Sequence, residues 1–210
     1  MKRIHLTLVL ATVFCVASFA AQANAGPVGT LEFNLGYVKS STELIPDESL
    51  GGGLGFGAAY WRSASPVVQW GVEASYDNLG NIETSYFDTF SGLNVSEEFN
   101  AKVLRVGPAI RMNFGSMVGP NFFAQGGAGL YNVAWDYSEV TDFPSTFEMD
   151  DSSSKVGFNL GAGVGFPLGP KTRMSIMGSY HVVPGPEADG QEFMDDLNNL
   201  QLRAGVGIGL

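Results

Sequence analysis

Hydrophobic and polar residues alternate one by one in eight separate segments of the chain. Such alternation is typical of a β-strand whose two faces meet different surroundings. The last segment is a clear example, because Leu202, Ala204, Val206 and Ile208 are interleaved with arginine and glycine. The segments lie at about residues 31–37, 54–60, 68–76, 104–114, 121–137, 156–166, 173–182 and 200–210. The pattern therefore predicts an all-β chain of eight strands.

The fifth segment changes phase along its length. Phe122 and Ala128 suggest one face of the strand, whereas Tyr131 and Trp135 fall on the other. A β-bulge adds one residue to a strand and so exchanges its two faces. We therefore expect a bulge near Gly126.

The connections between the segments alternate in length. Short connections lie at about 63–66, 115–120 and 167–171. Long connections lie at about 40–50, 78–98, 138–154 and 184–197. This alternation predicts an antiparallel up-and-down sheet, with tight turns at one end and long loops at the other.

The composition of the second face indicates which side of the sheet is outside. A face that meets water carries many Lys and Glu residues, but here it is mostly Gly, Ser, Asn and Gln, with almost no Lys. The chain holds 28 glycines and only 15% charged residues, and its mean hydropathy is +0.09. Small residues suit the narrow interior of an eight-stranded barrel, and an apolar exterior suits lipid. The predicted fold is an eight-stranded antiparallel up-and-down transmembrane β-barrel.

The first 25 residues read as a secretory signal peptide, which leaves residues 26–210 as the barrel domain. Lys2 and Arg3 precede an apolar stretch, and Ala23-Asn24-Ala25 fits a cleavage site between small residues. The alternative is an uncleaved membrane helix, but the apolar stretch is shorter than the ~20 residues that a span requires.

A few charged residues lie within the strands, on the phase expected to face the lumen. These are Glu32, Glu73, Arg105, Arg111 and Arg203. A buried charge without a partner is costly, so we expect the acids and arginines to pair across the lumen. The alternative is a path for protons or ions.

Aromatic residues occur toward the ends of the apolar faces. Tyrosine and tryptophan are enriched where a membrane protein crosses the lipid–water interface. The expected girdle residues are Tyr37, Tyr60, Trp70, Tyr76, Trp135, Tyr137 and Tyr180.

Most of the 21 acidic residues lie in the four long connections, and the net charge is −10. Such a chain repels phosphate backbones, which argues against nucleic-acid binding. Glu148, Asp150 and Asp151 form a candidate cation-binding loop, since divalent cations prefer carboxylate oxygens. The alternative is a solvated negative surface.

The whole pattern resembles the bacterial outer-membrane β-barrel family. That family includes the transmembrane domain of outer-membrane protein A and the small adhesin and opacity-type barrels. The resemblance covers residues 26–210 and includes the glycine-rich strands at 160–166 and 202–210. It implies the bacterial outer membrane as the location, with lipids and lipopolysaccharide as surroundings and the barrel assembly machinery as inserter. It also implies a monomer without a cofactor or resident metal. Leu210 stands where family members commonly end in an aromatic residue.

Three functions agree with this resemblance. The first is a structural or surface-interaction role, with a plugged polar lumen and long acidic extracellular loops. The second is a small porin-like channel for ions or hydrophobic molecules. The third is a lipid A-modifying enzyme that uses His181 and Ser179, but the deacylase pattern His-x-Ser-Asn is replaced by His181-Val182-Val183-Pro184. We expect a non-enzymatic protein with a lumen-lining His181.

Overall fold

The structure is a computed structural model. It describes residues 29–40, 43–45, 48–49, 51–115, 119–142, 146–185, 187–188, 191–192 and 196–210. The expected signal peptide, residues 1–25, lies outside this part of the chain. Within the described residues, no helix has the length and apolarity needed to cross a bilayer.

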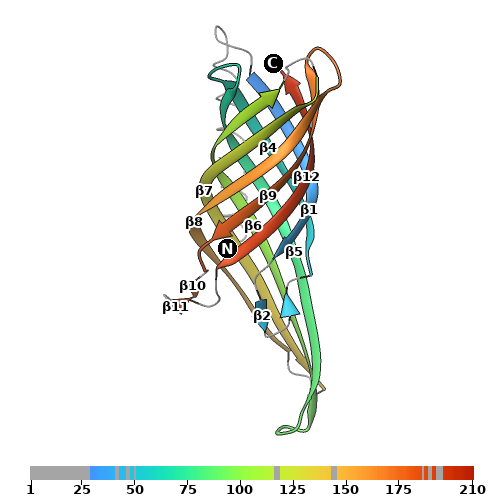
Figure 1. The fold of residues 1–210 in the computed structure, drawn as a ribbon. Helices are drawn as coiled ribbons and strands as arrows, with labels where there is room; N and C mark the ends of the chain where they lie inside the picture. The colour runs from blue at the N-terminus through green and yellow to red at the C-terminus, as the bar shows by residue number, and fades with distance from the viewer. Residues whose placement is uncertain are drawn as a thin grey trace.

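Eight strands close into one antiparallel barrel (Figure 1). They are β1 (Gly29–Ser40), β4 (Gly53–Ser63), β5 (Val68–Asp88), β6 (Leu93–Gly115), β7 (Asn121–Thr141), β8 (Thr146–Pro167), β9 (Thr172–Val183) and β12 (Leu197–Gly209). Each strand pairs with its neighbour along the chain, and β1 pairs with β12 to close the ring. The predicted eight-stranded fold is confirmed.

Four short strands form two small hairpins outside the ring. β2 (Glu43–Ile45) pairs with β3 (Glu48–Ser49), and β10 (Glu187–Ala188) pairs with β11 (Gln191–Glu192). Both hairpins belong to connections that the sequence analysis expects to be long.

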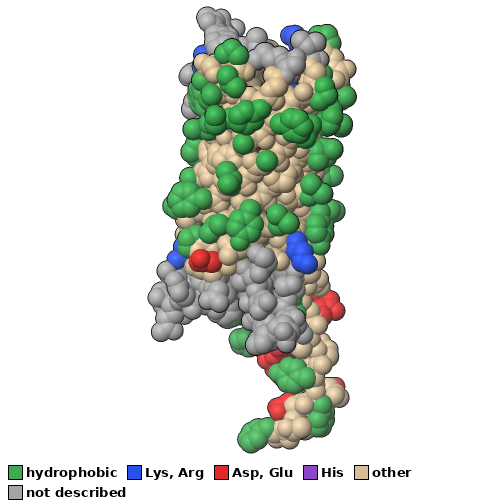
Figure 2. Space-filling model, in the orientation of Figure 1, with side chains coloured by type: hydrophobic (Ala, Val, Ile, Leu, Met, Phe, Trp, Pro, Cys, Tyr) green, Lys and Arg blue, Asp and Glu red, His purple; other side chains and the backbone are tan. Residues whose placement is uncertain are grey.

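The alternation of the sequence becomes the two faces of the barrel wall. Leu35, Leu160 and Leu202 are exposed on the outer face, where apolar side chains cover the wall (Figure 2). Their sequence neighbours Asn159 and Arg203 are buried on the inner face. A closed sheet pairs all its strands, as a segment that crosses lipid requires.

The expected bulge near Gly126 is wrong. β7 keeps one register with β6 and one with β8 along its whole length. Phe122 and Leu130 therefore face outward, and Tyr131 faces inward, without any phase change. A register shift occurs instead in β5, between Asn78 and Asn81.

Two of the expected long loops are continuations of strands. β5 to β8 run on past the ring as a four-stranded sheet, which projects at the end opposite the C-terminus (Figure 1). We call this sheet the extension and define it as residues 81–100, 136–142 and 146–150. The predicted loops at 78–98 and 138–154 are wrong as loops, because their polar residues pair across strands.

Candidate functional site

The centre of the lumen holds two linked ion pairs. Arg105 Nη2 donates to Glu73 Oε2 at 2.7 Å, and Arg111 Nη1 donates to Glu32 Oε2 at 2.7 Å. Gln125 joins the pairs, since it accepts from Arg111 Nε at 3.0 Å and donates to Glu73. All five side chains are buried. The structure thus brings four of the five sequence-predicted charges into one hydrogen-bonded group.

A third ion pair joins Arg203 to Asp77, a residue that the sequence analysis missed. Asp77 also accepts hydrogen bonds from Ser75 Oγ at 3.2 Å and Gln201 Nε2 at 3.1 Å. The sequence does carry a signal for it, because Asp77 continues the inward phase of Glu73 and Ser75. The predicted third segment ends one residue before it.

A glycine makes room for this third pair. A Cβ atom at Gly57 would lie only 2.8 Å from Arg203 Nη1 and 2.9 Å from Asn34 Oδ1. Arg203 Nη1 donates to that same Asn34 oxygen. Any larger side chain at position 57 would displace the arginine, so this inward glycine is required by close packing.

His181 lies between two hydroxyl groups inside the barrel. Its Nδ1 is 3.0 Å from Tyr131 Oη, and its Nε2 is 3.1 Å from Ser179 Oγ. A serine nucleophile activated by histidine requires a third group that orients the ring, and here a neutral phenol occupies that place. The adjoining cavity, which Glu73 and Arg105 also line, has a volume of about 20 Å³. That is room for about one water molecule, not for a substrate.

The lumen is apolar at the end that leads into the extension. A buried cluster fills it: Val38, Leu79, Ala101, Val103, Tyr131, Val133, Trp135, Val183 and Leu197. The expectation of a polar interior is therefore wrong for this layer. Packed hydrophobic side chains occupy this layer, whereas ion pairs occupy the central layer.

The expected aromatic girdle is partly wrong. Trp135 is only 1% exposed and belongs to the inner cluster, because it shares the inward phase of Tyr131. Tyr137 lies two residues further along β7, within the extension. The other five expected residues share the outward phase: Tyr37, Tyr60, Trp70, Tyr76 and Tyr180. Tyr60, however, is only 8% exposed. Whether these five mark the lipid interface stays a prediction.

The placement of the tryptophans can be checked by fluorescence in lipid. Trp70 is 43% exposed on the outer wall, whereas Trp61 and Trp135 are inside. We expect brominated lipid to quench Trp70 strongly in a W61F/W135F variant. We expect almost no quenching of Trp135 in the matched W61F/W70F variant. Similar quenching of both would contradict the assigned faces.

The three residues of the candidate cation-binding loop lie on β8, not on a loop. Strand alternation places Glu148 and Asp150 on one face of the extension, while Asp151 belongs to the other phase. Among the residues that the structure describes, no group of three or more His, Cys, Asp or Glu side chains is arranged to hold a metal ion. The predicted three-residue cluster is therefore wrong, since an extended strand separates its members.

The extension has two chemically different faces. One face continues the outer wall and exposes five carboxylates: Glu83, Glu98, Asp136, Glu148 and Asp150. The other face continues the lumen lining and is mostly apolar or aromatic: Ile82, Tyr86, Val95, Phe99, Tyr137, Phe147 and Met149. We call these the acidic face and the aromatic face.

Two carboxylates lie among the aromatic rings. Tyr86 Oη donates to Glu97 at 3.0 Å, and Tyr137 Oη donates to Glu139 at 3.4 Å. Burial, together with the charges of Glu97 and Glu139, raises the pKa of Tyr137 to about 12. The phenol thus stays neutral and remains a hydrogen-bond donor at physiological pH.

Comparison with known proteins agrees with this architecture. Residues 6–208 match the family described as "Outer membrane protein beta-barrel domain". Neisserial surface protein A is similar in structure, with a TM-score of 0.60, 12% identity, and coverage of 86% of this chain and 96% of that one. A major outer membrane protein from Thermus thermophilus has a TM-score of 0.54, 11% identity, and coverage of 87% and 99%. No curated protein matches the sequence.

These solved structures share the fold, and their low identities carry no information about a ligand. The family match spans nearly the whole chain and agrees with the closed ring and its apolar outer wall. The chain belongs to the outer-membrane protein β-barrel domain family and resides in the bacterial outer membrane.

Proposed function

We propose that this barrel is a surface-interaction protein whose acidic face binds a positively charged protein surface. The barrel anchors the extension in the membrane, and the extension presents carboxylates outside it. Outer-membrane lipids and lipopolysaccharide surround the apolar wall, the barrel assembly machinery inserts it, and the protein acts as a monomer.

The observation that carries this proposal is the arrangement of the carboxylates. Glu83 lies directly opposite Glu98, and Asp136 directly opposite Asp150. Like charges opposite each other destabilise a sheet, so this arrangement reduces the stability of the free extension. A basic partner relieves the repulsion, while Lys102 relieves it only locally through its bond to Asp136.

The interior supports a closed barrel rather than a channel. Three ion pairs cross the central layer, and an apolar cluster fills the layer next to the extension. The small cavity beside His181 also argues against an enzyme. Steady single-channel steps in a planar bilayer would contradict the closed lumen.

A pair of charge-removing variants tests the acidic face. We expect E98Q/D150N to weaken binding of an oligolysine peptide by at least ~10-fold at low salt. We also expect it to be more stable to urea by about 0.2–1 kcal/mol, because two like-charge pairs are removed.

The matched control removes two charges from the aromatic face. We expect E97Q/E139Q to bind the peptide within about twofold of the parent, because its acidic face is intact. Its net charge equals that of E98Q/D150N, so the two variants have the same long-range attraction. Equal loss in both double variants would show attraction to net charge alone and would overturn the proposal. If both double variants bind the peptide as tightly as the parent, the proposal is overturned as well.

A further inference from the structure

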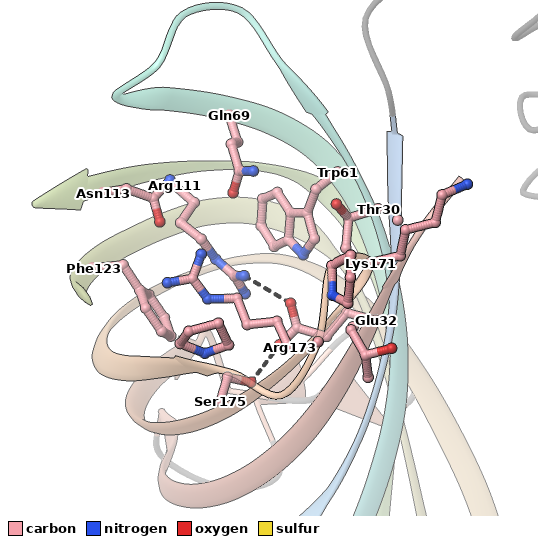
Figure 3. Close-up of a pocket in the computed structure, with 16 residues that line it drawn as sticks. Thr30, Glu32, Trp61, Gln69, Arg111, Asn113, Phe123, Lys171, Arg173 and Ser175 are labelled. Carbon is pink, nitrogen blue, oxygen red and sulfur yellow. Dashed lines mark hydrogen bonds and ion pairs between the residues drawn. The ribbon is translucent and has the colours of Figure 1, made fainter. Parts of the chain in front are cut away.

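A cavity of about 210 Å³ lies inside the barrel at the tight-turn end (Figure 3). Its lining includes Glu32, Arg111 and Arg173, together with the polar side chains Thr30, Gln69 and Asn113. One water molecule needs only about 10–15 Å³ of such space. The cavity is therefore large enough for a small polyatomic ion together with water.

The charges that line this cavity do not balance. Both oxygens of Glu32 are already engaged, since Oε2 accepts from Arg111 and Oε1 accepts from Ser175 Oγ at 2.7 Å. The lumen holds three acid–arginine pairs, and Arg173 is a fourth arginine that no described acid pairs with. Lys171 adds a further positive charge to the lining.

The Arg173 guanidinium reaches the cavity with one nitrogen, Nη2, that lacks an acceptor among the described residues. Its Nη2 atom is buried, and none of the described residues accepts a hydrogen bond from it. A Cβ atom at Gly165 on the neighbouring strand would lie 2.5 Å from Arg173 Nε, so the arginine packs directly across that glycine. Among the described groups, Arg111 repels Arg173 and Glu32 attracts it.

Aromatic rings hold the second arginine in place. The Arg111 guanidinium carbon lies 4.2 Å from the Trp61 ring centre and 4.4 Å from the Phe123 ring centre. Cation–π contacts of this kind fix a guanidinium without neutralising it. Two arginines thus reach the same cavity from β6 and β9, and Glu32, the acid among its described lining residues, pairs with Arg111 (Figure 3).

From this geometry we infer that the cavity binds an oxyanion, a phosphate or carboxylate group, against Arg173. A guanidinium offers parallel N–H donors that match the oxygens of such an anion. The anion supplies the charge that no described acid supplies for Arg173, and Thr30, Gln69 and Asn113 offer further polar contacts. The phosphate group can be that of a free ion or that of a lipid headgroup at the barrel mouth.

The test titrates inorganic phosphate into the refolded full chain in a zwitterionic detergent, with the Arg173 Nε–Hε signal followed by NMR. We expect a saturable shift for the parent. We expect R173Q to bind at least ~10-fold more weakly, by calorimetry, and R173K to keep part of the affinity. Arg62 lies on the outer face at the same end, so R62Q is the matched control and should bind like the parent.

Several outcomes separate the possibilities. A shift with phosphate identifies a free anion, and a shift only in micelles that contain phosphatidylglycerol identifies a headgroup. The inference is overturned if neither probe shifts the signal, if R173Q binds like the parent, or if chloride at equal ionic strength has the same effect. Heat-modifiable gel migration verifies that each variant is folded.

Discussion

Changing Asp77 to Asn should destabilise the barrel by about 3–5 kcal/mol. The substitution keeps the shape of the side chain but leaves Arg203 buried without its carboxylate. Breaking a buried ion pair on one side is costly because the remaining charge has lost both its water and its partner. Urea-induced unfolding in lipid vesicles, followed by tryptophan fluorescence, measures the loss.

The same substitution at Asp136 is the control. Asp136 also pairs with a cation, Lys102 at 2.8 Å, but the two side chains are 56% and 36% exposed. Exposed pairs contribute about 0–1 kcal/mol, since water already solvates both charges. We therefore expect D136N to change the unfolding free energy little, and a similar loss in both variants would contradict the central role of the lumen pairs.

The second large effect is expected on the outer wall. Leu202 lies midway along β12 and is 61% exposed on the apolar outer face. An arginine near the bilayer midplane of a barrel costs about 2–4 kcal/mol, because the charge enters hydrocarbon. We expect L202R to lose that much stability in lipid vesicles.

The control for L202R is an arginine at Val140, a position that we expect to meet water instead of lipid. It is 49% exposed, but it lies on the acidic face of the extension, opposite Ser96 and Thr146. V140R places the same charge near carboxylates rather than near lipid, so its stability should equal or slightly exceed that of the parent. If V140R loses as much stability as L202R, the lipid boundary does not lie between the ring and the extension.

The ring of strands is predictable because its two faces differ so strongly. The outward phase meets lipid and is therefore rich in Leu, Val and Phe. The inward phase meets a narrow lumen and therefore carries Gly or a polar residue that has a partner. The alternation at 160–166 and 202–210 follows from this difference alone, without any knowledge of the partner strands.

The extension is harder to recognise in the sequence. Its two faces alternate less strictly than those of the ring, since Val140 lies on the acidic face and Glu97 and Glu139 lie on the aromatic face. The stretch Asp150-Asp151-Ser152-Ser153 has the composition of a loop, yet it continues β8 because β7 pairs with it throughout. Neighbouring strands here override a weak local preference.

The interior contacts are hidden from the sequence for a different reason. Glu32 and Arg111 are 79 residues apart and lie on strands that are not adjacent. Which acid meets which arginine depends on how the barrel closes, and phase alone assigns only the side. The prediction for Trp135 is wrong for a related reason. An aromatic residue near a strand end can lie either at the lipid interface or in an apolar cluster inside the barrel, and only the phase of the residue distinguishes these two positions.

The extension also leaves its two outer sheet edges, on β5 and β8, without a described pairing strand. Residues 146–152 of β8 pair with β7 on one side, and no described strand pairs with them on the other. An unpaired edge strand can form backbone hydrogen bonds with a strand of a second molecule. If a second copy paired through this edge, its Glu148 and Asp150 would approach Glu148 and Asp150 of the first copy. Repulsion between these carboxylates acts over roughly 10 Å at 0.1 M salt. Repulsion between these carboxylates therefore disfavours pairing of two copies through the β8 edge, while this edge stays accessible to a chain of opposite charge.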